Sequence, residues 1–190
     1  MELQNMKIAG SGTISGGEYN VVSIAGSGSS TADISCKLLK VAGTASFKGC
    51  VDAEEISIAG SSKFHQNLKS KKIKIAGTAK VEGNIESEEL NIDGNINILG
   101  ECNVGTLKQE GAGSKFNNIY GEYIKIESKR GKKIEVNEIE ATEIELRKVD
   151  AKRISGDKIT VYGNSKIDVI EFRTSLKISK NVEVKEIIKL

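Results

Sequence analysis

The side chains that could perform acid–base chemistry are scattered along this chain. His65 is the only histidine among 190 residues, and it follows Phe64, which the sequence pattern places facing inward. Enzymes that cleave polysaccharides hold catalytic carboxyl groups together in environments that separate their pKa values. Here the acidic pairs Glu54-Glu55 and Glu88-Glu89 are separated by Lys71-Lys72, and the aspartates share no common register. We therefore expect an outward, solvated His65, a ladder of charges and no catalytic site.

Residues that could hold a metal ion or a nucleotide are equally few. Cys36, Cys50 and Cys102 form no CxxC pair and are odd in number, which indicates neither a metal framework nor a disulfide scaffold. The segment 26–30 is rich in glycine and serine, but it lacks the lysine and the helix of a phosphate-binding loop. The sequence predicts no metal, no cofactor and no enzymatic activity, with thiols that are reduced and mostly buried.

The charge pattern favours neither nucleic acid nor a membrane anchor. The net charge is +2, whereas a nucleic-acid binder usually has a strongly basic face. The first residues show no signal peptide, and no apolar run approaches the ~20 residues that span a bilayer. We expect a cytoplasmic protein, with a membrane-proximal position left open. One basic loop, 128–133, is a candidate contact for a partner or an anionic membrane. Its basic residues are Lys129, Arg130, Lys132 and Lys133.

A repeat determines which elements must position all these side chains. Ile75-Ala76-Gly77 recurs at an interval of about 17 residues, and a fixed period of this length is typical of a repeat architecture. The other copies are Ile8-Ala9-Gly10, Ile24-Ala25-Gly26, Val41-Ala42-Gly43, Ile58-Ala59-Gly60 and Ile92-Asp93-Gly94.

The aligned copies share one template. Residues 68–77 read apolar, polar, small, two polar, apolar, polar, apolar, any residue, glycine, and residues 34–43, 51–60 and 85–94 follow the same rule. A further strand follows each glycine, so each repeat contains about three short strands. Such short strands are stable only when each repeat stacks on the last around a shared core. The sequence predicts an all-β parallel β-helix with about 17 residues and three strands per coil, a coil being one turn of the solenoid.

A left-handed β-helix acyltransferase is the enzyme most easily confused with such a chain. It needs a six-residue apolar repeat sustained over many coils, and a catalytic histidine. Ile75 and Val81 are six residues apart, but Ser87 breaks the run. The pattern therefore argues against this class of enzyme.

Three features of the template predict how successive coils fit together. The glycine exemplified by Gly77 suits a corner with a positive φ or with a close approach of two backbones. Asn67 and Asn84 lie one repeat apart, which predicts a ladder of side-chain amides. The charged pairs named above alternate in sign from coil to coil, which disfavours a slip of one coil.

The period loosens in the middle of the chain and then returns. Ile119 lies one full repeat after Cys102, and the same offset is found again near the C-terminus. We predict one solenoid over residues 1–190, with an irregular stretch near 108–135 between a regular N-terminal part and a looser C-terminal part. Two helical segments that meet with an offset are the alternative. About eleven coils would make a rod roughly 50 Å long at the strand spacing of ~4.8 Å.

Two shorter copies of the template follow the irregular stretch, at residues 139–146 and 149–154. Their alignment places Val149 in the template position of Ile139. It also predicts that Thr142-Glu143 is followed by Lys152-Arg153 in the same position of the next coil.

The segment KVEGNIESEELNI at residues 80–92 and the recurring Ile-Ala-Gly-Ser phrase resemble repeats of the bactofilins, which are polymer-forming bacterial cytoskeletal proteins. The longer Gram-positive members are the most similar. The resemblance covers residues 6–107, and over 134–190 only the strand template matches. It implies a right-handed, three-sided parallel β-helix that assembles end to end into filaments without nucleotide. It also implies self-association, with other bactofilins and envelope or morphogenesis proteins as further partners.

The two ends of a solenoid present unpaired strand edges, and both ends of this chain are apolar in sequence. We therefore predict a non-enzymatic structural protein that assembles end to end into nucleotide-independent filaments. The alternative is a monomeric or dimeric β-helix scaffold that binds an envelope or morphogenesis protein. The predicted assembly residues are Leu3, Met6 and Ile8 at one end and Val184, Ile187, Ile188 and Leu190 at the other.

Overall fold

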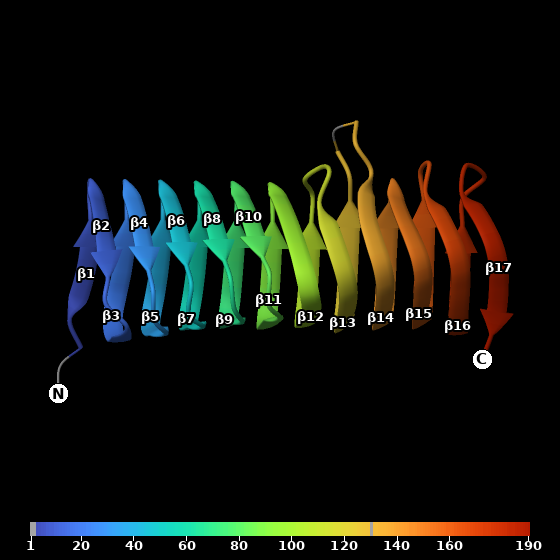
Figure 1. The fold of residues 1–190 in the computed structure, drawn as a ribbon. Coiled ribbons are helices and arrows are strands. Elements are labelled where there is room, and N and C mark those ends of the chain that lie inside the picture. The colour runs from blue at the N-terminus through green and yellow to red at the C-terminus, as the bar shows by residue number, and fades with distance from the viewer. Residues whose placement is uncertain (1–2, 130) are drawn as a thin grey trace.

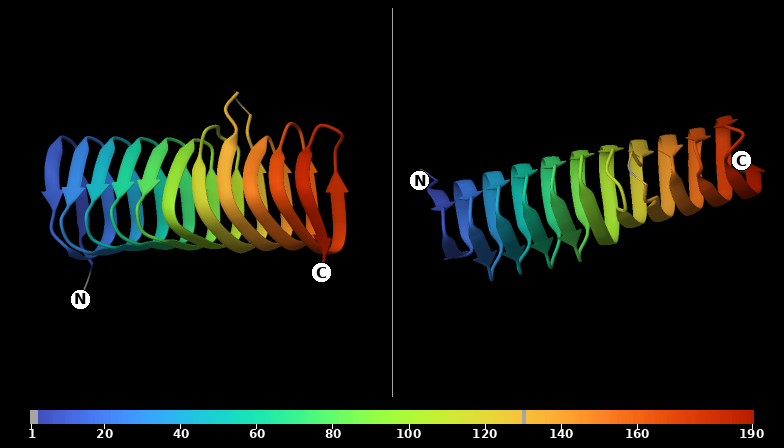
Figure 2. Two further views of the ribbon diagram at one scale, coloured as in Figure 1. Left: turned by 45° about the vertical axis from the view of Figure 1, so that its right-hand side comes forward. Right: turned by 90° about the horizontal axis from the view of Figure 1, so that it is seen from above.

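The protein is a straight rod of stacked coils. The computed structural model describes residues 3–129 and 131–190, and within these ranges it consists of strands, turns and loops with no helix. The N- and C-termini lie at opposite ends of the rod (Figures 1 and 2). All strand pairs are parallel, and about 17 residues make one coil, so the predicted all-β parallel solenoid is confirmed.

The strands are short at the N-terminal end and long at the C-terminal end. Up to residue 92 each coil has one strand of eight residues and one of four, apart from the first coil. Beyond residue 94 single strands of up to 15 residues run around most of a coil. The strands are β1 (Asn5–Ile8), β2 (Ser11–Ile14), β3 (Gly17–Ile24), β4 (Ser27–Ser30), β5 (Ile34–Val41), β6 (Thr44–Phe47), β7 (Val51–Ile58), β8 (Ser61–Phe64), β9 (Leu68–Ile75), β10 (Thr78–Val81), β11 (Ile85–Ile92), β12 (Asn95–Gln109), β13 (Lys115–Glu127), β14 (Ile134–Arg147), β15 (Val149–Tyr162), β16 (Lys166–Ile178) and β17 (Glu183–Lys189).

Each eight-residue strand covers two faces of the rod. In β9, Leu68 and Ser70 face inward, as do Ile73 and Ile75, whereas Lys71 and Lys72 are both more exposed than these neighbours. Side chains of a flat strand alternate strictly between its two faces. Two consecutive outward residues therefore mark a corner within the strand. Two of the three strands predicted for each coil are therefore joined into one bent strand, such as β9. The shorter strand that follows, such as β10, forms the third face.

The core is a set of inward columns that run the length of the rod. Ile56, Ile73 and Leu90 form part of one such column, and each is fully buried. Phe47 and Phe64 stack in another, with ring centroids 5.0 Å apart and an angle of 10° between the ring planes. Full burial of an aliphatic or aromatic side chain is worth about 1.5–3 kcal/mol. Columns of such residues hold the short strands together.

The pairing of strands confirms the predicted register on both sides of the middle region. Cys102 pairs with Ile119 across β12 and β13, and Ile159 pairs with Leu176 across β15 and β16. Both offsets equal the period of the regular coils. Parallel pairing also joins β13 to β14 and β14 to β15. Strand pairing is therefore continuous across the middle region, and the loops lie outside it.

The alignment of the two shorter copies is wrong. Val149 pairs with Ile134, and Ile139 pairs with Ile154 instead, so this coil is shorter than the regular ones. Arg153 consequently lies beside Glu138 and not beside Glu143. The cause is the turn at Lys148, the only residue between β14 and β15, whose φ of 55° makes the connection unusually short. The preceding coil carries a longer loop.

The glycine column is explained by close approach and not by a positive φ. A Cβ atom on Gly77 would lie 2.0 Å from the carbonyl oxygen of Gly60, and one on Gly60 would lie 1.9 Å from that of Gly43. Neither φ falls in the left-handed region. The corners of successive coils are therefore in backbone contact, which only glycine permits without displacement of the chain.

The predicted amide ladder is a side-chain-to-backbone ladder. The Asn67 side-chain oxygen accepts a hydrogen bond from the backbone N–H of Asn84 at 2.9 Å, and Asn84 does the same for Glu101 at 2.9 Å. Asp33 accepts in the same way from Cys50 at 2.8 Å. Each of these side chains thereby satisfies a corner N–H of the next coil.

Two loops project from one side of the rod between β12 and β14, and the taller one connects β13 to β14 (Figure 1). Serines at the bases of the loops satisfy backbone groups. Ser114 accepts a hydrogen bond from the N–H of Ile96 at 3.1 Å, and the Ser128 hydroxyl donates to the carbonyl of Lys132 at 2.6 Å. The loops thus leave the coil without leaving these buried positions unpaired.

Candidate functional site

The C-terminal end of the rod is an exposed apolar surface. Ile187 pairs with Ile170, a fully buried residue of an inward column, so the Ile187 side chain continues that column at the last coil. In this last coil Ile187 is 50% exposed, and Leu190 is 57% exposed. Val184 continues the column of Ile167 and is half-buried. Val184 and Ile187, which would be core in the middle of the rod, therefore form part of its end. Leu190 follows the register of the exposed Arg173 and adds an apolar side chain at the edge of the last coil.

The backbone at this end is an open strand edge. β17 pairs with β16 on one side, in a register that runs from Glu183 to Lys189. Along the other side of β17, the N–H and C=O groups that point along the rod axis pair with no further strand within the described residues. An edge of this kind is a template for pairing with another chain.

Ile188 occupies a different position from the other predicted residues of this end. It pairs with Glu171 and is half-buried. Because successive side chains of a strand point to opposite faces, Ile188 points away from the column of Ile187. It therefore lies on the side of the last coil and not on the end surface.

The N-terminal end presents less apolar surface. Ile8 is only 8% exposed, and Ile14 in the same coil is fully buried. Met6 is half-buried against the core, and Leu3 is exposed. Of the three residues predicted for this end, Leu3 and Met6 are therefore accessible, whereas Ile8 belongs to the core beneath them. The two ends differ in a way that the sequence pattern did not indicate.

Two of the basic side chains in the loop form ion pairs within the chain, which the sequence did not indicate. Lys129 forms an ion pair with Glu110 of the neighbouring loop, and Lys133 pairs with Asp150 at 2.6 Å. Hydrogen bonding to Lys129 lowers the pKa of the Glu110 carboxyl below its ordinary value. Lys132 is exposed. The remaining predicted residue, Arg130, lies outside the described residues.

His65 lies on the outside of the rod, but it is half-buried in an ionic cluster. Its Nδ1 is 2.9 Å from a carboxylate oxygen of Glu82, and its Nε2 is 3.5 Å from the Ser46 hydroxyl. Lys80 and Lys63 bind the other oxygen of Glu82 at 3.0 and 3.1 Å. Hydrogen bonds from Lys80 and then Lys63 lower the pKa of Glu82 to about 2.

The order serine, histidine, carboxylate is that of a nucleophilic triad, but the geometry favours a structural cluster. The separation between Ser46 and His65 is at the limit of a hydrogen bond. Two lysines share the carboxylate that would orient the imidazole. Sequence reasoning missed the contact, although the spacing of one repeat between His65 and Glu82 was a signal for it.

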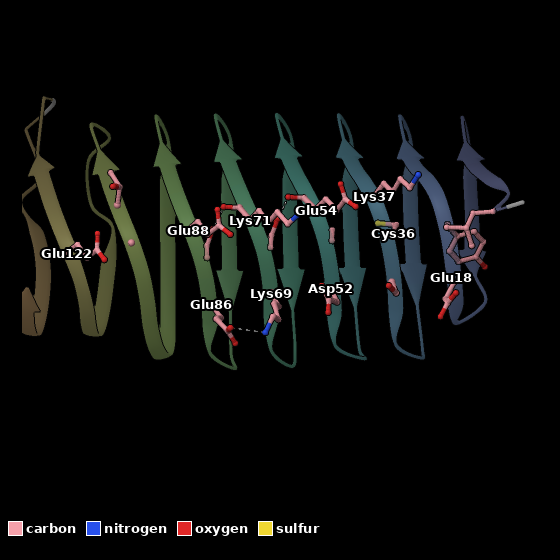
Figure 3. Close-up of a pocket in the computed structure, with 18 residues that line it drawn as sticks. Glu18, Cys36, Lys37, Asp52, Glu54, Lys69, Lys71, Glu86, Glu88 and Glu122 are labelled. Atoms are coloured by element: carbon pink, nitrogen blue, oxygen red, sulfur yellow. Dashed lines mark hydrogen bonds and ion pairs between the residues drawn. The ribbon is translucent and has the colours of Figure 1, made fainter. Parts of the chain in front are cut away.

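A shallow groove of about 800 Å³ runs along one side of the N-terminal half of the rod (Figure 3). Small inward residues form its floor, and charged residues form its two walls. No motif in the sequence predicted this groove. The signal for a groove was the third position of the template, which is a small residue, because a column of small side chains leaves the surface hollow. The floor residues are Cys36, Ala53, Ser70 and Ser87.

Together these features define the class of protein: a parallel β-solenoid with one exposed apolar end. Among residues 3–129 and 131–190 there is no cluster of His, Cys, Asp and Glu able to hold a metal ion. The same part of the chain contains no helix suited to crossing a membrane.

Comparison with known families then identifies the particular family. The family model for bactofilin, described as polymer-forming cytoskeletal, matches residues 4–103. The chain therefore belongs to the bactofilin family, a family with a structural, polymer-forming role. No curated protein matches the chain, and neither does any solved structure.

Proposed function

We propose that this chain polymerises end to end without nucleotide, as a non-enzymatic cytoplasmic scaffold, and that the C-terminal end is the principal interface. The family supports the polymer-forming role. The observation that carries the choice of end is the exposure of Ile187 and Leu190, in contrast to the buried Ile8 and Ile14 of the N-terminal coil.

The energetics favour contact between apolar ends. Burying a whole leucine or isoleucine side chain is worth about 1.5–3 kcal/mol, so the exposed halves of Ile187 and Leu190 are worth about 1 kcal/mol each. When two like ends meet, both chains contribute these residues. Backbone hydrogen bonds between the open edges of the two β17 strands add to the apolar contact. Like-with-like contacts at both ends, C-terminal with C-terminal and N-terminal with N-terminal, give a filament without polarity.

Negative-stain electron microscopy of end variants tests this proposal. Ile187→Lys combined with Leu190→Lys places two charges in the interface, and we expect single rods or pairs in place of filaments. The matched control is Thr174→Lys with Asn181→Lys, which adds the same charge at exposed positions of the last coils. Filaments of unchanged length in the end variant would refute the C-terminal interface. Loss of filaments in the control as well would refute the specific role of the apolar residues.

A scaffold that binds a partner through the basic loop is the second candidate. The projection of this loop from the rod supports it (Figure 1). The ion pairs of Lys129 and Lys133 within the chain count against it, because they neutralise part of the positive charge. A pull-down that compares the chain with a variant whose residues 128–133 are replaced by glycine and serine tests it. Recovery of the same envelope or morphogenesis protein by both forms would contradict a role for the loop.

A further inference from the structure

The walls of the groove carry charge in an ordered pattern (Figure 3). We call the wall that follows the floor residues the upper row and the wall that precedes them the lower row. Residues one coil apart in each row are about 4.8 Å apart, the spacing of paired strands. The upper row is Lys37, Glu54, Lys71 and Glu88, and the lower row is Ser35, Asp52, Lys69 and Glu86.

The two rows differ in how their charges are satisfied. In the lower row Lys69 and Glu86 pair at 2.8 Å. The four residues of the upper row are all exposed, and across residues 3–129 and 131–190 none of them forms an ion pair. The residues that directly follow the upper row in sequence do form an ion pair, since Lys72 binds Glu89 at 2.6 Å. The upper row thus presents four free charges to the outside.

The order of signs in the upper row makes it complementary to itself. The row reads plus, minus, plus, minus along four successive coils. A two-fold axis between Glu54 and Lys71 sets Glu54 of one copy opposite Lys71 of the other, and Lys37 opposite Glu88. The same axis sets Asp52 of the lower row opposite Lys69. A parallel arrangement in register would instead set each charge opposite its like.

The spacing of the charges selects a second solenoid as the partner. Side chains on one face of an extended peptide recur every ~6.6–7 Å, whereas those of the upper row recur every ~4.8 Å. A peptide strand would fall out of step by ~6 Å over the four coils. A second rod has the same spacing and stays in step.

We propose that two copies of this chain lie side by side and antiparallel along the groove, with the two-fold axis between Glu54 and Lys71. This lateral contact uses a different surface from the end contact proposed above. It joins rods along the N-terminal half and leaves the C-terminal end free. End contacts and lateral contacts together would convert single filaments into paired ones.

Charge reversal within the full chain tests the proposal. The background is Ile187→Lys with Leu190→Lys, which blocks the C-terminal contact. Any pairs joined at the N-terminal end are common to all the variants, so the readout is the change in dimerisation relative to this background, by sedimentation equilibrium at low salt. Glu54→Lys or Lys71→Glu alone turns two attractive contacts of the dimer into two repulsive ones. We expect each to weaken dimerisation at least about tenfold. Asp93→Lys, an exposed reversal at a different corner, is the control and should leave dimerisation unchanged.

The double variant Glu54→Lys with Lys71→Glu gives the sharpest outcome. Its row reads plus, plus, minus, minus, which places like charges side by side within the chain but opposite charges across the two-fold axis. We expect dimerisation to recover to the level of the background. Failure to recover, equal weakening by Asp93→Lys, or a background that stays monomeric at all concentrations would overturn the proposal. If the background still elongates, the end proposal fails, and the width of filaments of the same variants tests the lateral contact separately.

Discussion

Replacement of Gly77 by alanine tests whether backbone contact between coils governs the glycine column. The added Cβ would lie 2.0 Å from the Gly60 carbonyl oxygen, and real Cβ atoms essentially never approach an atom closer than 3.0 Å. The corner must therefore shift by about 1 Å. That carbonyl accepts the N–H of Thr78 at 2.9 Å, so the shift disturbs a hydrogen bond of the ladder.

The expected loss of stability is about 2–4 kcal/mol, because an unpaired backbone group costs about 1–3 kcal/mol and the displaced corner also strains the coil that follows. Gly10 is the matched control, because it occupies the same position in the first coil and a Cβ there meets nothing within 4 Å. Gly10→Ala should be neutral or stabilise by up to about 1 kcal/mol, since it restricts the unfolded chain.

Urea denaturation followed by far-ultraviolet circular dichroism measures both effects. The two variants are compared in the background that does not elongate and at one protein concentration, because association stabilises the folded state. Gly77→Ala within about 0.5 kcal/mol of the parent would refute the close-approach explanation, since that is the range of an ordinary surface substitution. An equal loss for Gly10→Ala would show that glycine is required there for another reason.

Three further predictions concern thiols, core and acid stability. Burial raises the pKa of Cys36 to about 11 and that of Cys102 to about 12. At pH 8 a thiol reagent should therefore react with the exposed Cys50 of the native protein and much more slowly with the other two thiols. Equal rates at all three would contradict the burial of Cys36 and Cys102. Phe64→Ala should cost about 3–5 kcal/mol of unfolding free energy in the same urea assay, and a loss below about 1 kcal/mol would contradict the stacked core. The pKa of Glu82 is lowered from 4.5 to about 2, so its charge stabilises the fold above pH 4.5, and this contribution is lost as the pH falls towards 2. The difference in melting temperature between the parent and Glu82→Gln should therefore shrink over that range. A constant difference would contradict the ionic cluster.

The periodic part of the fold was predictable because every coil repeats the same physical requirement. An inward residue such as Ile73 must stack on Ile56 and Leu90, and this fixes a constant offset between coils that is visible in the sequence. The same reasoning misaligned Val149, because the offset there depends on the φ of a single residue, Lys148. Turn length leaves no periodic trace in the pattern of apolar residues.

The candidate sites were less predictable than the fold. The pattern identified Ile187 as an end residue, but exposure of that end depends on how the last coil is covered, which no local pattern encodes. The cluster around His65 and the ion pairs of the basic loop arise between coils, from side chains that lie a full repeat or more apart in the sequence. The groove results from backbone curvature at a column of small residues, for which sequence provides only an indirect signal.

Sedimentation velocity of the purified 190-residue chain over a range of concentrations, without nucleotide, tests the central claim most directly. We predict species that grow with concentration well beyond a dimer, with Ile187→Lys and Leu190→Lys reducing them to small species. A single monomeric boundary at every concentration would contradict the claim that this solenoid is a self-assembling polymer subunit.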